Sequence, residues 1–130
     1  MSVEQFGDLS AQAVRERRSA IFKGLRVVDL GIGLPPALIS KYMAELGATV
    51  TVTPPAGDPT SESYPAYGAW RSKHEIVASS LDVDARLADA DVCILGGEDF
   101  PDVYPLRDAG ALAKKYPRLV VLEIEAYPKG

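Results

Sequence analysis

The fold is decided by residues 25–36, which read LRVVDLGIGLPP. Residues 25–30 form a nearly continuous apolar run, which is typical of a short strand buried on both faces of a parallel sheet. Glycines follow at positions 31 and 33, and Pro35 and Pro36 suit the first turn of a helix, where a missing N–H costs nothing. A strand, a glycine turn and a helix in this order predict the start of an α/β domain.

The rest of the chain continues this alternation. Further strands are predicted at 48–53, 74–78, 91–95 and 119–124, and helices at 10–22, 35–46, 83–90 and 105–116. The alternation predicts a Rossmann-like, doubly wound α/β fold with a mainly parallel sheet of about five strands and helices on both faces. The loops after Leu30, Thr53 and Leu95 then open on the carboxyl edge of the sheet, where such folds bind ligands. We therefore expect an N-terminal helical extension, residues 1–23, and one domain, residues 24–130.

The composition limits the classes of function. The chain has 130 residues, of which 47% are hydrophobic and 25% charged, as expected for one soluble domain. Its 18 acidic and 14 basic side chains give a net charge of −4, which argues against nucleic acid as a partner. No apolar run approaches the roughly 18 residues of a membrane span, and the N-terminus has no signal-peptide core, so we expect a cytoplasmic protein without a membrane partner. The single cysteine, Cys93, lies in an apolar run, which indicates a core residue rather than a nucleophile.

Two types of nucleotide site begin with a similar strand and glycine turn. A dinucleotide fingerprint requires a third glycine near Pro36 and an acidic residue about 20 positions further on, where this chain has Thr53. A methyltransferase that binds S-adenosylmethionine also begins Asp-Leu-Gly-x-Gly and needs an acid at the end of the second strand. Thr53 argues against both ligands, and the methyltransferase-like domain stays an alternative that rests on residues 29–33 alone. Gly31 and Gly33 have two explanations of about equal weight. They either let the backbone approach a ligand or simply allow a tight turn that needs the conformational freedom of glycine.

Three further polar features have ordinary structural interpretations. The run Arg15-Glu16-Arg17-Arg18 suits either a docking patch or, more commonly, a solvated helix face. His74, at a predicted strand start, is more typical of a surface or hydrogen-bonded histidine than of a proton carrier. The acidic pairs Asp82/Asp84 and Glu98/Asp99 are typical of helix caps and solvated turns rather than of acid–base catalysis.

Several stretches resemble the N-terminal domain of the family III CoA-transferases, the group of formyl-CoA transferases and α-methylacyl-CoA racemases. They are GLRVVDLG at residues 24–31, LGATV at 46–50 and PPAGDP at 54–59, with shorter similarities at 71–74, 90–92 and 116–120. The resemblance covers Gly24 to about Ile124, which is most of this chain but only the opening portion of a family member. These motifs are modest individually and fairly specific together.

The resemblance implies that coenzyme A or an acyl-CoA thioester is the substrate and that no metal takes part. By position, the implied CoA contacts are Gly33, Leu34, Trp70, Arg71, Ser72, Lys73, Gly96, Gly97 and Glu98. Arg71 and Lys73 are the cations that the phosphates of CoA require. Trp70 offers a flat face for adenine, although a lone tryptophan in a domain more often serves packing.

The chain also departs from the family. The nucleophilic Asp of the family lies beyond the last strand predicted here, so no catalytic residue is assigned and the chain alone is expected to be inactive. A second chain or a further C-terminal part would then supply catalysis. The family usually has Arg where this chain has Ile32, Glu where it has Thr53, and Glu-Asn-Phe where it has Leu95-Gly96-Gly97. These departures favour an alternative, a non-catalytic binding or structural module of the same fold.

Overall fold

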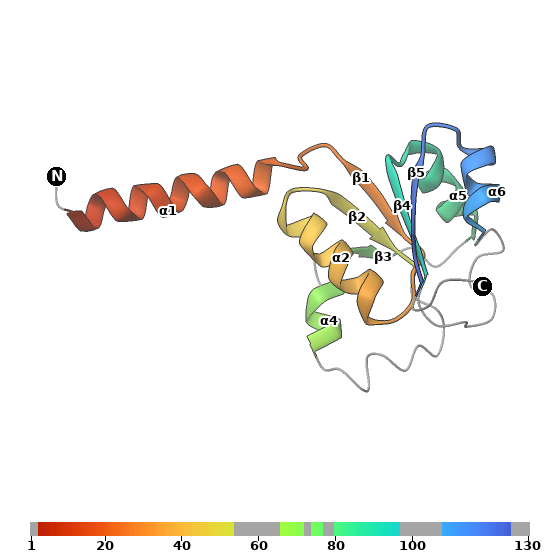
Figure 1. Cartoon of the computed structure of the whole chain (residues 1–130), viewed down its shortest axis with the longest axis horizontal. Coiled ribbons are helices and arrows are strands. Elements are labelled where there is room, and N and C mark those ends of the chain that lie inside the picture. Colours follow the sequence, from red (N-terminus) through yellow and green to blue (C-terminus); the bar gives the residue numbers. More distant parts are fainter. Residues whose placement is uncertain (1–2, 54–65, 72–73, 77–79, 97–107, 126–130) are drawn as a thin grey trace.

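The protein is built around an open parallel β-sheet (Figure 1). A computed structural model of the chain describes residues 3–53, 66–71, 74–76, 80–96 and 108–125. The strands are β1 (Arg26–Asp29), β2 (Thr49–Val52), β3 (Glu75–Ile76), β4 (Val92–Gly96) and β5 (Val120–Ile124). Their order across the sheet is β3-β2-β1-β4-β5, and every neighbouring pair is parallel. The expected mixed α/β fold with a parallel sheet is confirmed, and the strand order is consistent with a Rossmann-like fold.

Helices cover both faces of the sheet. The described helices are α1 (Val3–Ala20), α2 (Leu34–Glu45), α4 (Ala66–Arg71), α5 (Ser80–Asp89) and α6 (Ala109–Lys115). Helix α2 packs on one face and contacts α4, whereas α5 and α6 lie on the opposite face (Figure 1). Helix α1 stands apart from the sheet. Among the described helices, none is long and apolar enough to cross a membrane.

Two apolar clusters sandwich the sheet, and they explain why the two central residues of β1, Val27 and Val28, are both apolar. Successive side chains of a strand point to opposite faces, so Val27 belongs to one cluster and Val28 to the other. On the α2 face, strand residues Val27, Val50, Val52 and Ile94 pack with Ile39, Met43 and Ala44. On the other face the buried residues are Val28, Leu30, Val83, Leu87, Cys93, Leu95, Leu112 and Leu119. Because both faces are covered, neither central side chain of β1 meets water.

Several element boundaries differ from those expected. Four strands have four or five residues, but β3 pairs over only two, and residues 77–78 of the predicted third strand lie outside the described residues. Helix α1 spans residues 3–20 rather than 10–22, and α5 begins at Ser80 rather than at residue 83. Helix α6 begins after Asp108, whose carboxylate accepts a hydrogen bond from the Ala111 N–H at 2.7 Å. This N-cap fixes the start of the helix later than the apolar spacing indicated.

Candidate functional site

The loop after β1 is held in place by three backbone N–H groups. The N–H of Gly31 donates to the Asp29 carboxylate at 2.8 Å, and the N–H of Leu30 donates to the carbonyl of Ile94 at 2.9 Å. The N–H of Ile32 donates to the carbonyl of Gly96, also at 2.9 Å. The last two bonds tie the loop to the carboxyl end of β4. Two of the regions expected to contact CoA, at Gly33 and at Gly96, therefore lie together at the carboxyl edge.

The two glycines of the loop serve different structural purposes. A Cβ added at Gly31 would overlap the Pro36 side chain, so this position requires glycine for close packing. Gly33 has φ +89° and is the N-cap residue of α2, with no side-chain cap. Nothing lies near the place of a Cβ at Gly33, so only its backbone conformation favours glycine. Both glycines thus have a structural reason that does not involve a ligand.

The start of α2 offers few donors for an anion. A helix N-terminus binds phosphate through the unpaired N–H groups of its first turn. Here α2 begins Leu34-Pro35-Pro36, and the two prolines have no N–H. Because the N–H groups of residues 30–32 already bond within the protein, those of Gly33 and Leu34 are the donors left in this stretch to face a ligand.

The Asp29 carboxylate makes the loop a poor phosphate site as well. Asp29 is only 1% exposed, although it stands at the end of β1 directly before the loop. Its hydrogen bond from Gly31 stabilises the turn, and its position brings an acidic group close to any bound ligand. In the sequence Asp29 stands out only as part of a motif. Its structural role depends on its burial, which the motif does not reveal.

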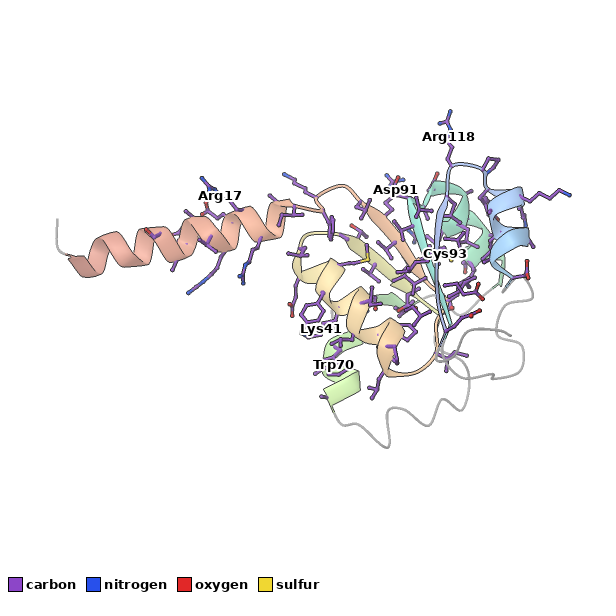
Figure 2. The ribbon with its side chains drawn as sticks, in the orientation of Figure 1. Arg17, Lys41, Trp70, Asp91, Cys93 and Arg118 are labelled. Carbon is purple, nitrogen blue, oxygen red and sulfur yellow. The ribbon has the colours of Figure 1, made fainter. Side chains whose placement is uncertain are left out.

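The expected CoA residues on and after α4 are described only in part. Helix α4 ends at Arg71, and Trp70, half-buried, lies on this helix beside α2 (Figure 2). The packing interpretation of Trp70 agrees with this position. Four expected contacts lie outside the described residues: Ser72, Lys73, Gly97 and Glu98. Gly96 is described and has φ +117°, and a Cβ there would overlap the carbonyl of Ile124 on β5.

Ile32 and Thr53, two of the positions at which the chain differs from the motifs of the family III CoA-transferases, are buried. Ile32 is 1% exposed, so the arginine usual at this place in the family would put a charge into the core. Thr53 is also buried, and its N–H donates to the carbonyl of Asp29 at 3.4 Å, which prolongs the pairing of β2 with β1. Both residues therefore have structural roles.

The two remaining titratable candidates, Cys93 and His74, are buried. Cys93 is fully buried on β4 (Figure 2), which confirms it as a core residue. Burial, with a smaller contribution from the charge of Asp29, raises the pKa of its thiol from 9.0 to about 12, so the thiol stays protonated at neutral pH. His74 is buried too, not at the surface. Within the part of the chain that the structure describes, no three His, Cys, Asp or Glu side chains gather as metal ligands would.

The acidic pair of α5 was predicted to cap a helix or a turn, but α5 begins at Ser80, so both members lie inside the helix. Asp82 lies in the first turn of α5, where its charge favours the helix dipole. Asp84 instead accepts hydrogen bonds from the Tyr116 hydroxyl at 3.2 Å and from Lys115 Nζ at 3.3 Å. It joins α5 to the end of α6, a contact between residues more than thirty positions apart that local spacing does not reveal.

Two pockets lie at the amino edge of the sheet, opposite the expected site. One, of about 300 Å³, is lined by Arg26, Val27, Val28, Thr49, Thr51, Arg86 and Asp89. The other, also of about 300 Å³, lies between the end of α5 and the turn from α6 to β5, and Lys115, Tyr116 and Arg118 are among its lining residues. Arg26 and Asp89 form an exposed ion pair at 3.9 Å. Neither pocket includes a residue of the expected CoA site.

A comparison with known protein families finds no match for the chain, and a comparison with curated proteins finds none. The resemblance to the family III CoA-transferases therefore rests on the sequence motifs themselves.

Proposed function

We propose that the chain is the Rossmann-like, CoA-binding portion of a cytoplasmic family III acyl-CoA transferase or racemase. CoA lies at the carboxyl edge of the sheet, between the loop after β1 and the end of α4. Catalytic residues come from a second chain or from a further part of the protein. The observation that carries the proposal is the hydrogen bond from Ile32 to Gly96. It joins the loops after β1 and β4, the neighbouring strands at which the strand order reverses, and such switch points are the usual ligand sites of these folds.

The phosphates of CoA are assigned to the side chains at and after the end of α4. The buried Asp29 carboxylate and the two prolines of α2 disfavour a phosphate at the loop itself. Gly33 and Leu34 then contact an uncharged part of the ligand, such as an amide of its pantetheine arm. Arg71 and Lys73 meet the phosphates, because charged donors give the strong hydrogen bonds that phosphate groups form.

A second candidate is a non-catalytic module that keeps the fold without binding CoA. It is favoured by the burial of Ile32, because the family's arginine has no place there, and by the use of three loop N–H groups within the protein. A third, weaker candidate is a domain that binds S-adenosylmethionine.

Isothermal titration calorimetry separates these candidates. The purified chain is titrated with CoA, acetyl-CoA and S-adenosylmethionine, and the Arg71→Ala/Lys73→Ala variant is tested in parallel. The matched control is Lys114→Ala/Arg118→Ala, which removes the same two charges from exposed positions outside the proposed site. Arg118 lies at the amino edge of the sheet (Figure 2).

We expect CoA and acetyl-CoA to bind. The Arg71→Ala/Lys73→Ala variant should bind several-fold more weakly or worse, because hydrogen bonds to charged groups contribute about 1.5–3 kcal/mol each. The control variant should bind as the unmodified chain does. Absence of heat with both CoA ligands would overturn the proposal and favour the non-catalytic module, and heat with S-adenosylmethionine alone would favour the third candidate. Equal weakening in both variants would mean that only the net charge matters.

A further inference from the structure

The sheet carries a polar surface beside helix α5, at the amino ends of β1 and β2. Strand β2 and the residue after it read TVTVT over residues 49–53. Val50 and Val52 face the cluster under α2, so the threonines between and beside them lie on the opposite face. Thr51 pairs in register with Val28, which packs on the α5 side. No residue of β2 belongs to the apolar cluster on that side, so hydroxyl groups line the sheet there.

A pocket of about 300 Å³ lies over this surface. Its floor is buried, since Val28 is 2% exposed and Thr51 is 5% exposed. Its rim is exposed and mostly charged: Arg26 comes from β1, and Arg86 and Asp89 come from α5. Among the described helices, only α2 packs extensively on β2, and it covers the opposite face of the sheet. The described chain therefore leaves a hollow between α5 and β2.

The lining residues offer the hydrogen-bond donors that an anion requires. The planar guanidinium groups of Arg26 and Arg86 match the two oxygens of a carboxylate, to which each can donate a pair of hydrogen bonds. Thr49 and Thr51 add two hydroxyl groups on the adjacent strand, and a hydroxyl group also donates. Donors therefore come from three elements, β1, β2 and α5, that meet around one hollow.

The acidic side chain in the pocket holds Arg26 only weakly. Asp89 Oδ2 lies 3.9 Å from Arg26 Nη1, which is beyond hydrogen-bond distance. The two side chains are 75% and 63% exposed, and an exposed ion pair contributes little to stability. A second acid at this edge, Asp91 (Figure 2), accepts a hydrogen bond from the Arg26 N–H at 2.8 Å and does not line the pocket. A bound anion can therefore take the place of Asp89 beside Arg26 at little cost.

The charge and size of the pocket favour a small carboxylate over a phosphate. Two arginines and one aspartate leave a charge of +1 on the lining residues, which a single carboxylate neutralises. A phosphate dianion would leave an excess negative charge beside Asp89. Val28 on the floor offers an apolar contact for a short hydrocarbon chain. The volume of about 300 Å³ lies at the lower end of the range for small-molecule sites.

We propose that this pocket binds a small carboxylate anion, which accepts hydrogen bonds from Arg26 and Arg86 and displaces Asp89 from Arg26. Because Arg26 belongs to β1 and Arg86 to α5, the bound anion links the strand to the helix that packs on it. The site lies at the amino edge of the sheet, opposite the proposed CoA site, and it does not depend on that proposal.

An NMR titration of the full chain tests the site. Amide spectra of isotope-labelled protein are recorded during titration with sodium propionate and, separately, with inorganic phosphate, both at constant ionic strength. NMR is suited to this test because a ligand of so few atoms binds weakly. Propionate should shift the amide signals of Val28, Thr49 and Thr51 in a saturable manner. The signals of Gly33 and Gly96, at the carboxyl edge, should not move, and phosphate should bind more weakly than propionate.

Two substitutions of arginine should weaken this binding. Arg26→Gln and Arg86→Gln should each raise the Kd for propionate about tenfold or more, because each removes hydrogen bonds from a charged donor. The matched control is Arg17→Gln, which removes the same charge from an exposed position of α1 outside the pocket (Figure 2). It should bind propionate as the unmodified chain does. The amide spectrum of each variant also reports whether the fold is kept.

A substitution of Asp89 should strengthen the binding, which a damaged fold would not do. Asp89→Asn removes the negative charge that competes for Arg26, so propionate should bind several-fold more tightly. Its matched control, Asp82→Asn, makes the same change at an exposed position in the first turn of α5, outside the pocket, and should leave the Kd unchanged.

Four results would overturn the proposal. The first is the absence of saturable shifts with propionate, or shifts centred away from the pocket. The second is tighter binding of phosphate than of propionate, which would exclude a carboxylate as the preferred ligand. The third is equal weakening in Arg17→Gln, which would mean that only the net charge matters. The fourth is an unchanged Kd in Asp89→Asn, which would mean that the anion does not displace Asp89.

Discussion

The burial of Cys93 predicts how stability depends on pH above neutrality. Cys93 is the single cysteine of the chain, and its pKa is about 12 in the folded protein against an ordinary value of 9.0. The unfolded chain therefore releases this proton from about pH 9 upward, while the folded protein keeps it. The stability due to the neutral thiol is fully present below pH 9 and is lost as the pH rises from about 9 toward 12. The loss is about 1.4 kcal/mol for each pH unit in that window.

Comparison with Cys93→Ala isolates this effect, because all other titrating groups are common to both proteins. At pH 7 the substitution should cost about 1–2 kcal/mol, since it removes a buried sulfur from a packed cluster. By about pH 10.5 the unmodified protein has lost about 2 kcal/mol through its thiol, so the two proteins should be about equally stable. Urea unfolding under reducing conditions at several pH values, followed by Trp70 fluorescence, measures the difference. A difference that stays constant from pH 7 to 10.5 would refute the assignment of the raised pKa to burial.

Two further predictions concern glycines with positive φ and the N-cap of α6. Gly96→Ala should destabilise by more than about 3 kcal/mol, because the new Cβ overlaps the carbonyl of Ile124. Gly24→Ala should cost only about 1–2 kcal/mol, since its φ is also positive but its surroundings are open. If thermal unfolding showed that both substitutions cost the same stability, the positive φ alone would explain the two losses, and the overlap at Gly96 would not matter. Asp108→Ala should cost about 1 kcal/mol through loss of the N-cap of α6, whereas Asp108→Asn should cost much less; equal losses in urea unfolding would argue against capping.

The part of the fold that could be predicted was the part encoded in local spacing. The nearly continuous apolar run from Leu25 to Leu30 identified β1, because a strand buried on both faces has apolar neighbours along the chain. The two prolines and the apolar residues at helical spacing after them identified α2, because a helix buried on one face repeats its apolar residues every three to four positions. Helix α4 was missed. It has six residues, too few to show a helical repeat, and it owes its place to contact with α2.

The candidate site was less predictable because its structure depends on distant residues. Ile32 and Gly96 are 64 positions apart, and nothing in either stretch indicates that their backbones bond. The role of Asp84 with Tyr116 is of the same kind. Because the carboxyl ends of parallel strands meet at one edge, Gly33 and Gly96 were expected at the same edge, and the structure agrees. The motif does not indicate that the carboxylate of Asp29, at the end of β1, accepts a hydrogen bond from the Gly31 N–H.

The loop of residues 31–36 illustrates why a glycine motif and a ligand site must be argued separately. A glycine turn before a helix suggests phosphate binding because the backbone is accessible and the first helical N–H groups are unpaired. Here Gly31 is needed for contact with Pro36, and Gly33 for its φ, so both glycines would be required without any ligand. The prolines then remove two donors, and Asp29 adds a negative charge. Any CoA site of this protein must therefore obtain its phosphate affinity from cations outside the loop, which is why Arg71 and Lys73, rather than the glycines, decide the proposal.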